Sequence, residues 1–302
     1  VLSNRLEWQH NFQITKLLLL SAGYQFREQQ GENDTGLTNR ILSSNAGFAQ
    51  AQFNLWDRLF ATAGIRHDSY NVFGDATTYR LTGGYLHKET DTKIRGSYST
   101  GFRAPTMNEL YFPNFGNSQL GTEKSQSMDV GIDQYFFSKQ LKFTGGFFWN
   151  RYRNLITTTF DPTFCAPFST FGFCPQQIGE ASTKGWEAGL SYTYSSDRPF
   201  LKGLVVQANY TNTMTRDLVT QTRLPRWATD QWSASVSYQP IDPLWITLIG
   251  RYVGSRYNTT GDRQSLPAFD VWSLAVTYDV TKQLQAYLRA ENLFNEKYEE
   301  VA

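Results

Sequence analysis

The chain has little of several features that define large classes of proteins. Its 302 residues contain no apolar run near the roughly 18 residues of a membrane-spanning helix, and the leucine block Leu17–Leu20 ends at Ser21. This excludes a helical membrane protein. The 28 Lys and Arg against 27 Asp and Glu give a formal charge of only +1, so we expect no nucleic-acid partner. Two cysteines, Cys165 and Cys174, are too few for a zinc motif.

Signals for catalysis are also scarce. His10, His67 and His87 fall on separate predicted strands, and no sequence signature supports a Ser, His and acid constellation. The acidic turns at 31–34 and 261–262 lack the regular spacing of a known calcium loop. We therefore predict that the chain is not an enzyme and holds no resident cofactor or metal.

Aromatic residues are abundant instead, with 22 Phe, 17 Tyr and 8 Trp, and most segments alternate apolar and polar residues. Trp186, Ala188, Leu190 and Tyr192 share one parity, and the intervening positions are mostly polar or small. This period of two is typical of strands with one apolar and one polar face. We predict about fourteen strands, near residues 2–14, 17–29, 44–55, 58–70, 78–88, 92–103, 124–138, 140–158, 178–195, 203–216, 228–239, 244–257, 269–279 and 283–297.

The length of these strands favours an all-β, transmembrane antiparallel β-barrel. Many reach the roughly 9 to 11 residues that a tilted strand needs to cross a bilayer. Strands of a soluble sandwich, the alternative, are usually about 5 or 6 residues long. Aromatic residues near the ends of the apolar faces resemble the girdles of outer-membrane barrels, with lipid on that side and a polar lumen on the other. Charged residues predicted to face the lumen are Arg80, Lys93, Arg95, Lys142, Glu187, Arg251, Arg289 and Glu291.

Connections between the predicted strands alternate in length. Short turns near 15–16, 56–57, 89–91 and 138–139 are expected to be periplasmic, and long segments such as 104–123 and 159–177 extracellular. This places both ends of the chain outside, whereas single-chain bacterial barrels have an even strand count. We therefore expect residues 1–302 to be one partial barrel domain, without an N-terminal plug, the first strands or the last strand.

A motif at residues 96–131 resembles the barrel of TonB-dependent outer-membrane receptors, most closely those for cobalamin and less closely those for siderophores. The matching parts are Gly101 to Thr106, Asn108 to Tyr111, Phe115 to Asn117 with Leu120, and Glu123 to Ser125, with a second match at Glu291 to Tyr298. The resemblance implies about 22 strands, a plugged lumen and a periplasmic TonB partner that supplies energy. It also implies a bacterial outer-membrane location and a large metal complex as transported ligand.

The two long segments hold the candidate ligand-binding residues. These are Arg103, Asn108, Tyr111, Phe112, Phe115 and Asn117 in the first, and Phe164, Phe168, Phe171 and Phe173 in the second. The aromatics either stack on a bulky ligand or pack their segments against neighbours, and both interpretations stay open. Cys165 and Cys174, with eight residues between them, are expected to form a local disulfide, two free thiols being the alternative.

The sequence thus predicts the parent protein to be a receptor, monomeric in outer-membrane lipid, for TonB-dependent uptake of a large metal complex. Cobalamin is favoured, and a ferric siderophore is the second choice. A passive channel and a structural or adhesive barrel are the rival classes.

Overall fold

The computed structural model describes residues 2–32, 40–194, 201, 203–258 and 265–300. The described chain contains two short helices and many strands, and neither helix is long and apolar enough to cross a membrane. The helices are α1 (Met107–Tyr111) and α2 (Pro162–Cys165). The strands are β1 (Leu2–Thr15), β2 (Leu18–Gly31), β3 (Arg40–Leu55), β4 (Leu59–Tyr70), β5 (Gly74–His87), β6 (Thr92–Arg103), β7 (Glu123–Phe136), β8 (Leu141–Phe160), β9 (Phe173–Thr193), β10 (Val205–Asp217), β11 (Asp230–Ile241), β12 (Leu244–Val253), β13 (Arg256–Tyr257), β14 (Ser265–Leu266), β15 (Phe269–Asp279) and β16 (Gln285–Ala290).

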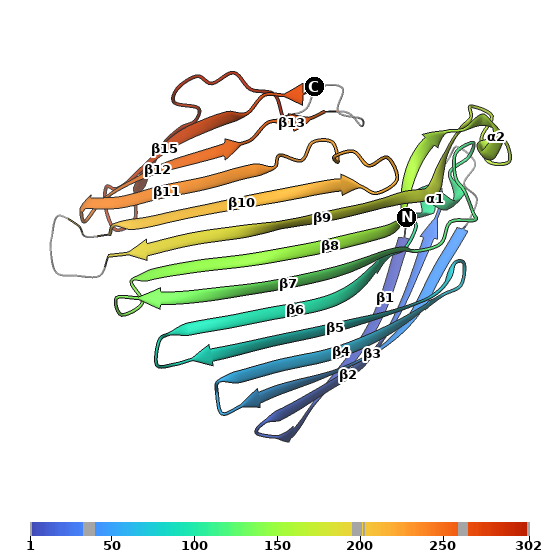
Figure 1. The fold of residues 1–302 in the computed structure, drawn as a ribbon, viewed down its shortest axis with the longest axis horizontal. Coiled ribbons are helices and arrows are strands. Elements are labelled where there is room, and N and C mark those ends of the chain that lie inside the picture. Colours follow the sequence, from blue (N-terminus) through green and yellow to red (C-terminus); the bar gives the residue numbers. More distant parts are fainter. Residues whose placement is uncertain (1, 33–39, 195–200, 202, 259–264, 301–302) are drawn as a thin grey trace. The chain divides into compact units, whose positions relative to one another are not determined.

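Fourteen of these strands form one sheet in which chain order is also hydrogen-bonding order: β1 to β12, then β15 and β16 (Figure 1). Strands β1 to β5, and β10 to β12 with β15 and β16, pair with their neighbours in antiparallel register, which confirms the predicted all-β fold, and the fourteen strands of the sheet confirm the predicted count. Several predicted short turns also match, because Trp56, Asp57, Asp91 and Ser138 have the positive φ values of tight turns.

The chain divides into two compact units. The first is Val1–Tyr85, Arg95–Met128 and Asn150–Ser182, and the second is Leu86–Ile94, Asp129–Trp149 and Thr183–Ala302.

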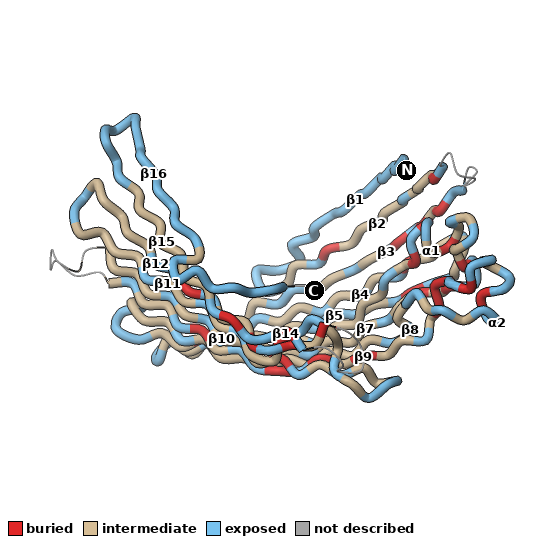
Figure 2. Tube along the Cα trace, turned by 90° about the horizontal axis from the view of Figure 1, so that it is seen from above, coloured by how far each residue is buried: buried red, intermediate tan, exposed pale blue. Residues whose placement is uncertain are grey.

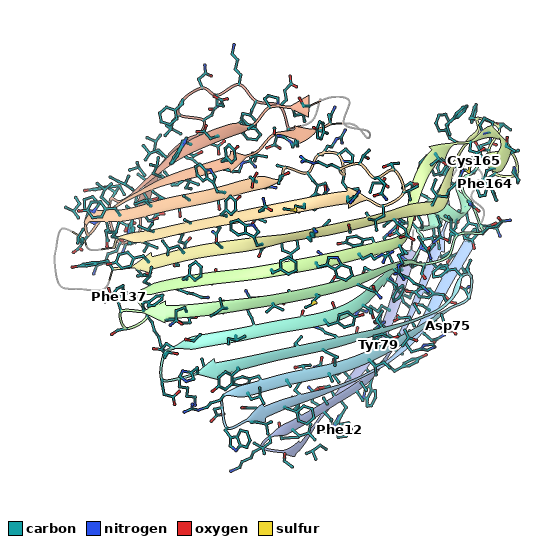
Figure 3. The ribbon with its side chains drawn as sticks, in the orientation of Figure 1. Phe12, Asp75, Tyr79, Phe137, Phe164 and Cys165 are labelled. Carbon is teal, nitrogen blue, oxygen red and sulfur yellow. A yellow bond between two sulfur atoms is a disulfide. The ribbon has the colours of Figure 1, made fainter. Side chains whose placement is uncertain are left out.

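Within the first unit, β1 to β5 separate apolar and polar residues onto opposite faces. Registers such as Trp8 with Tyr24 and Ile65 with Tyr79 place large apolar side chains on one face, where they are exposed. Figure 3 shows Phe12 and Tyr79, both of which belong to this face. On the other face the Arg66 guanidinium donates to both Asp68 oxygens at 2.7 and 2.8 Å, and the predicted lumen residue Arg80 lies opposite Gly64. Exposed apolar faces of this kind are typical of strands in membrane-spanning barrels.

Within the second unit, a glycine allows aromatic packing on the corresponding face. Gly250 lies opposite Trp272, and a Cβ at this glycine would be 2.7 Å from the Trp272 ring. Trp272 also packs edge-on against Trp232, at 5.8 Å between ring centroids. The ring therefore occupies the space that any side chain at position 250 would need.

Two predicted strands are shorter than expected. The strand expected over 244–257 ends at Val253, and the amide of the next residue, Gly254, still donates to Asp230 O of β11 at 2.8 Å. Beyond it, β13 and β14 form a separate two-stranded sheet. The strand expected over 283–297 ends at Ala290. Asn292 has a positive φ, and its side-chain oxygen accepts from the Glu296 amide at 2.8 Å, which makes this segment a turn.

Other boundaries also differ from the sequence. Strand β3 starts at Arg40 and β5 at Gly74, four residues earlier than predicted in each case, while α1 and α2 lie inside segments expected to be irregular. The acidic turn residues Asn33, Asp34, Gly261 and Asp262 lie outside the described residues.

Complete burial in the first unit is concentrated in the segment after β6, in α2 and at the start of β9. Side chains exposed by less than 2 % include Pro105, Leu110, Cys165, Cys174 and Pro175. By contrast, β1 is exposed along its whole length (Figure 2). The segments at the ends of β6 and β8 are therefore the best-packed part of this unit.

Candidate functional site

Arg103, the last residue of β6, anchors the segment that connects β6 to β7. Its guanidinium donates to both Glu123 oxygens at 2.6 and 2.7 Å and to both Glu109 oxygens at 3.0 and 3.1 Å. Glu123 is the first residue of β7, and its Oε1 also accepts from the Ile156 amide of β8 at 2.7 Å. One side chain thus joins the two ends of the segment and its helix. Paired, charge-assisted hydrogen bonds of this kind fix geometry as well as charge.

Helix α1 starts because Thr106 and Glu109 cap it. The Thr106 hydroxyl accepts from the Glu109 amide at 3.2 Å, and Glu109 Oε2 accepts from the Thr106 amide at 2.7 Å. This reciprocal pair is a capping box. Burial raises the pKa of the Glu109 carboxyl, but the hydrogen bonds from Arg103 and Thr106 outweigh burial, so its pKa lies below the usual range. Glu109 is therefore held as a carboxylate.

The aromatic residues at and after the end of α1 are only partly covered. The Arg40 guanidinium of β3 lies 5.0 Å from the centre of the Tyr111 ring, an arrangement favoured by the negative face of the ring. Phe112 is exposed, and its ring centroid is 6.4 Å from that of the half-buried Phe115. Gly116 must be glycine, because a Cβ there would lie 2.5 Å from the Tyr111 amide nitrogen.

The two long segments are joined to each other. Asn117 is 2 % exposed; its amide side chain donates to Pro175 O at 3.0 Å and accepts from the Gln119 amide at 2.9 Å. Nearby, the Gln177 side chain accepts from Gly121 N at 2.7 Å and donates to Gly121 O at 2.8 Å. The first segment is therefore fastened to the start of β9.

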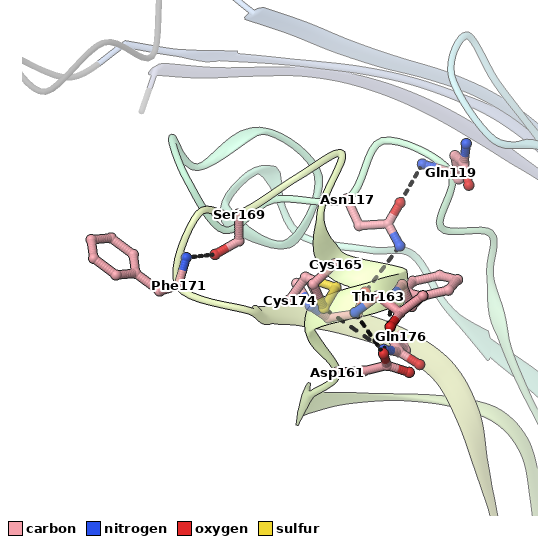
Figure 4. Close-up of a disulfide and its surroundings, with 11 residues drawn as sticks. Asn117, Gln119, Asp161, Thr163, Cys165, Ser169, Phe171, Cys174 and Gln176 are labelled. Atoms are coloured by element: carbon pink, nitrogen blue, oxygen red, sulfur yellow. Dashed lines mark hydrogen bonds between the residues drawn. A yellow bond between two sulfur atoms is a disulfide. The ribbon is translucent and has the colours of Figure 1, made fainter.

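The structure joins Cys165 and Cys174 in a disulfide that is fully buried (Figure 4). Before it, Asp161 caps α2 by accepting from the amides of Thr163 and Phe164 at 3.1 and 3.0 Å. The Asp161 amide in turn donates to Gly172 O at 2.9 Å. A covalent bond and a helix cap thus close the second segment on itself.

Most of the phenylalanines around this disulfide remain accessible. Phe171 is 72 % exposed, while Phe164 and Phe173 are more than 40 % exposed. Phe164 packs loosely against Phe168, with ring centroids 6.0 Å apart, and Phe173 packs against Phe160 at 4.8 Å. Figure 3 shows Phe164 beside Cys165 at the tip of the segment. The rings pair with each other and still present apolar surface outward.

A pocket of about 550 Å³ lies beside α1. Its lining includes two predicted residues, Arg103 and Asn108. Residues that the sequence reasoning missed contribute the opposite side, namely Arg27 and Gln29 of β2, Leu42 and Ser44 of β3, and Tyr70 of β4. Their register places them on the polar face, at the strand ends that carry the long segments. Strand parity could have identified this face in advance.

The predicted residues therefore differ in availability. Asn108, Phe112, Phe164, Phe171 and Phe173 are exposed, and Tyr111, Phe115 and Phe168 are partly covered. Arg103 and Asn117 use their polar atoms to hold the segments together. Their predicted contact with a ligand would require these bonds to be shared or broken.

Comparisons with known proteins agree on the fold. A sequence model of the family described as "TonB dependent receptor-like, beta-barrel" matches residues 2–293. "Vitamin B12 transporter BtuB" of Vibrio vulnificus (strain YJ016) is 28% identical over 304 residues, covering 98% of this chain and 46% of that protein.

Solved structures with the same fold carry different names. The ferric enterobactin receptor PfeA of Pseudomonas aeruginosa superposes with a TM-score of 0.81 at 17% identity, over 97% of this chain and 49% of that chain. The copper transporter OprC superposes with a TM-score of 0.79 at 13% identity, over 98% of this chain and 52% of that chain. The chain thus spans about half the length of the proteins it matches.

Proposed function

Since this chain belongs to the TonB-dependent receptor-like β-barrel family of the bacterial outer membrane, we propose that it forms part of the barrel and outer mouth of an active transporter. The ligand is a large, scarce metal complex. The long segments face the exterior, and the short turns face the periplasm. TonB supplies the energy through a part of the protein outside residues 1–302.

The strand edges support a larger barrel. Among the described residues, β1 pairs only with β2, and β16 only with β15. In lipid an unpaired edge leaves backbone N–H and C=O groups without partners, which costs several kcal/mol per group. We therefore propose that further strands pair with both edges in the whole receptor.

The observation that supports a binding role is that the segments 104–122 and 161–172 are held by hydrogen bonds and a disulfide beside the pocket. Arg103, Asn117 and the disulfide hold the backbone in place, while Asn108 and several phenylalanines remain accessible. Such preorganised aromatic and amide groups reduce the entropy lost on binding a bulky ligand.

Cobalamin is the favoured ligand. The Vibrio vulnificus relative, aligned over nearly the whole chain, is named a vitamin B12 transporter. A corrinoid offers apolar edges to phenylalanine rings and amide groups to Asn108. A ferric siderophore is the second candidate, because the PfeA structure has the same fold.

Uptake measurements on the full-length receptor test this proposal. Radiolabelled cyanocobalamin should accumulate in cells with TonB and not in otherwise identical cells without it. Accumulation of a ferric siderophore instead would transfer the assignment to the second candidate. Uptake that persists without TonB would indicate a passive channel, and surface attachment without uptake would indicate an adhesive barrel.

Equilibrium binding then locates the ligand. The triple variant Tyr111→Ala, Phe112→Ala and Phe115→Ala should weaken cyanocobalamin binding by about tenfold or more, the loss typical of buried aromatic anchors. Phe137→Ala is the matched control, because this residue is 72 % exposed in the short turn between β7 and β8. Unchanged affinity in a folded triple variant would remove these three residues from the site.

A further inference from the structure

A second cleft, of about 270 Å³, lies among the starts of β5 and β7, the end of β6 and the middle of β8 in the first unit. Its lining includes Asp75, Thr77 and Tyr79 of β5, Thr100 of β6, Lys124 and Gln126 of β7, and Arg151 and Arg153 of β8. Asp75 and Lys124 are each the second residue of their strand, so the cleft lies at the end of the sheet from which the segment 104–122 extends.

The strand register places this cleft on the apolar face of the sheet and not on the polar one. Tyr79 lies opposite Ile65, and both side chains are about half exposed. Lys124 and Gln126 have the same parity on β7 as Met128, which is 45 % exposed. The cleft is therefore at the outer border of the surface that meets lipid. Figure 3 shows Asp75 and Tyr79 near each other on β5.

Positive charge predominates in the cleft, with three cationic side chains and one carboxylate, Asp75. The Asp75 carboxylate lies 3.9 Å from His67 Nε2, and Arg151 donates to Glu180 at 3.3 Å. Lys124 and Arg153 are exposed, and neither is paired with a carboxylate in the part of the chain that the structure describes. Hydroxyl groups of Thr77 and Thr100 lie among them.

We propose that this cleft binds the phosphate group of an anionic lipid in the outer leaflet, with Lys124 and Arg153 as the principal charged contacts. Arginine and lysine suit phosphate oxygens, and hydroxyl groups add further hydrogen bonds. The lipid is favoured over a soluble anion because the acyl chains of the same molecule would lie on the apolar face below the cleft, along Tyr79 and Leu81, which are both exposed. The cleft and the pocket beside α1 share one lining residue, Phe102, but Lys124 and Arg153 line the cleft and not that pocket.

Lipid retention tests the proposal on the full-length receptor. Native mass spectrometry, with lipid A added to the detergent-solubilised protein, would measure the bound fraction. The double variant Lys124→Gln and Arg153→Gln should bind lipid A about tenfold more weakly. The reason is that two basic residues that attract the anionic lipid headgroup lose their charge. Lys124→Arg with Arg153→Lys keeps both charges and should bind nearly as the native protein does.

The control removes the same charge elsewhere. Lys16→Gln with Lys282→Gln changes two exposed lysines in short turns and should leave lipid A binding unchanged. Equal binding by the double variant and this control would overturn the proposal, and so would equal binding of lipid A from which the phosphates have been removed. If millimolar inorganic phosphate binds the cleft as tightly as lipid A does, the site takes a free anion and the lipid assignment is wrong.

Discussion

The two long segments of the first unit are held in opposite ways. Residues 104–122 are fixed by charge, because Arg103 bonds to Glu109 and Glu123, and by burial of Leu110 and Leu120. Residues 161–172 are closed by one covalent bond, and the phenylalanines around it stay exposed.

This difference separates two tasks. In the first segment, the polar side chains of Arg103 and Asn117 form the hydrogen bonds that anchor the segment, to Glu123 and to Pro175 O. The disulfide needs no side chains beyond its two cysteines, so neighbouring rings such as Phe164 and Phe171 remain free for contact. The first segment is thus a fixed support, and the second offers the larger apolar contact surface.

The largest effect is expected when the charged anchor is removed. Arg103→Ala leaves two carboxylates facing each other, with Glu123 only 13 % and Glu109 22 % exposed. We expect the free energy of local opening of residues 104–122 to fall by about 3 kcal/mol, the low end for a broken buried pair because Arg103 itself is partly exposed. Hydrogen exchange at the Leu110 and Asn117 amides measures this fall.

Arg103→Lys tests how much of this stability comes from the charge of Arg103 and how much from the shape of its guanidinium group. Lysine keeps the charge and loses the planar fork, so the fall should be roughly half as large. Equal protection in Arg103→Ala and the native protein would show that burial alone holds the first segment.

Removal of the disulfide should have the next largest effect. Cys165→Ser with Cys174→Ser opens a loop of about ten residues, and chain entropy predicts a loss of about 2–3 kcal/mol. Faster proteolysis within residues 161–172, with unchanged exchange at Leu110, is the expected result. Labelling of both cysteines by a thiol reagent in the unreduced, unfolded native protein would contradict the bond itself.

Replacing exposed rings should affect binding and not stability. Phe164→Ser with Phe171→Ser removes two accessible phenylalanines, so local stability should change by no more than about 0.5 kcal/mol. If the second segment contacts the ligand, cyanocobalamin affinity should fall by about 1–2 kcal/mol, measured by equilibrium binding. A larger fall for Tyr111, Phe112 and Phe115 than for this pair would reverse the roles of the two segments.

The sequence predicted the strand faces well because alternation is local. Ile65, Tyr79 and Leu81 show their face through parity alone, and the register agrees. The helices were missed because four or five residues carry no period, although Thr106 with Glu109 has the spacing of a capping box, and Asp161 followed by proline is a helix-start signal.

The roles of single residues were harder to predict. The sequence makes Asn117 a candidate ligand contact. In the structure its side chain donates a buried hydrogen bond to Pro175 O, 58 residues further along the chain, and no local sequence pattern reveals such a contact. Arg27 and Ser44 line the pocket beside α1 for the same reason, because the register of β2 and β3 brings them together. Long-range contacts thus decide which polar residues support the site and which face it.

The smallest expected effect is a pH dependence of the stability of the first segment, which tests the role of charge there. The pKa of Glu109 is lowered in the folded state, since the bonds from Arg103 and Thr106 outweigh burial. A depressed carboxyl pKa stabilises the fold at pH values above its unfolded value, about 4.3, and this contribution is lost as the pH falls through the folded pKa. Protection of residues 104–117, corrected for the intrinsic exchange rate, should therefore be constant from pH 7 to pH 5 and should decline below about pH 4. Glu109→Gln should lower protection at pH 7 by less than Arg103→Ala does and should remove this decline. An unchanged decline in Glu109→Gln would show that Glu109 does not cause the pH dependence and would leave it with a capping role that does not depend on its charge.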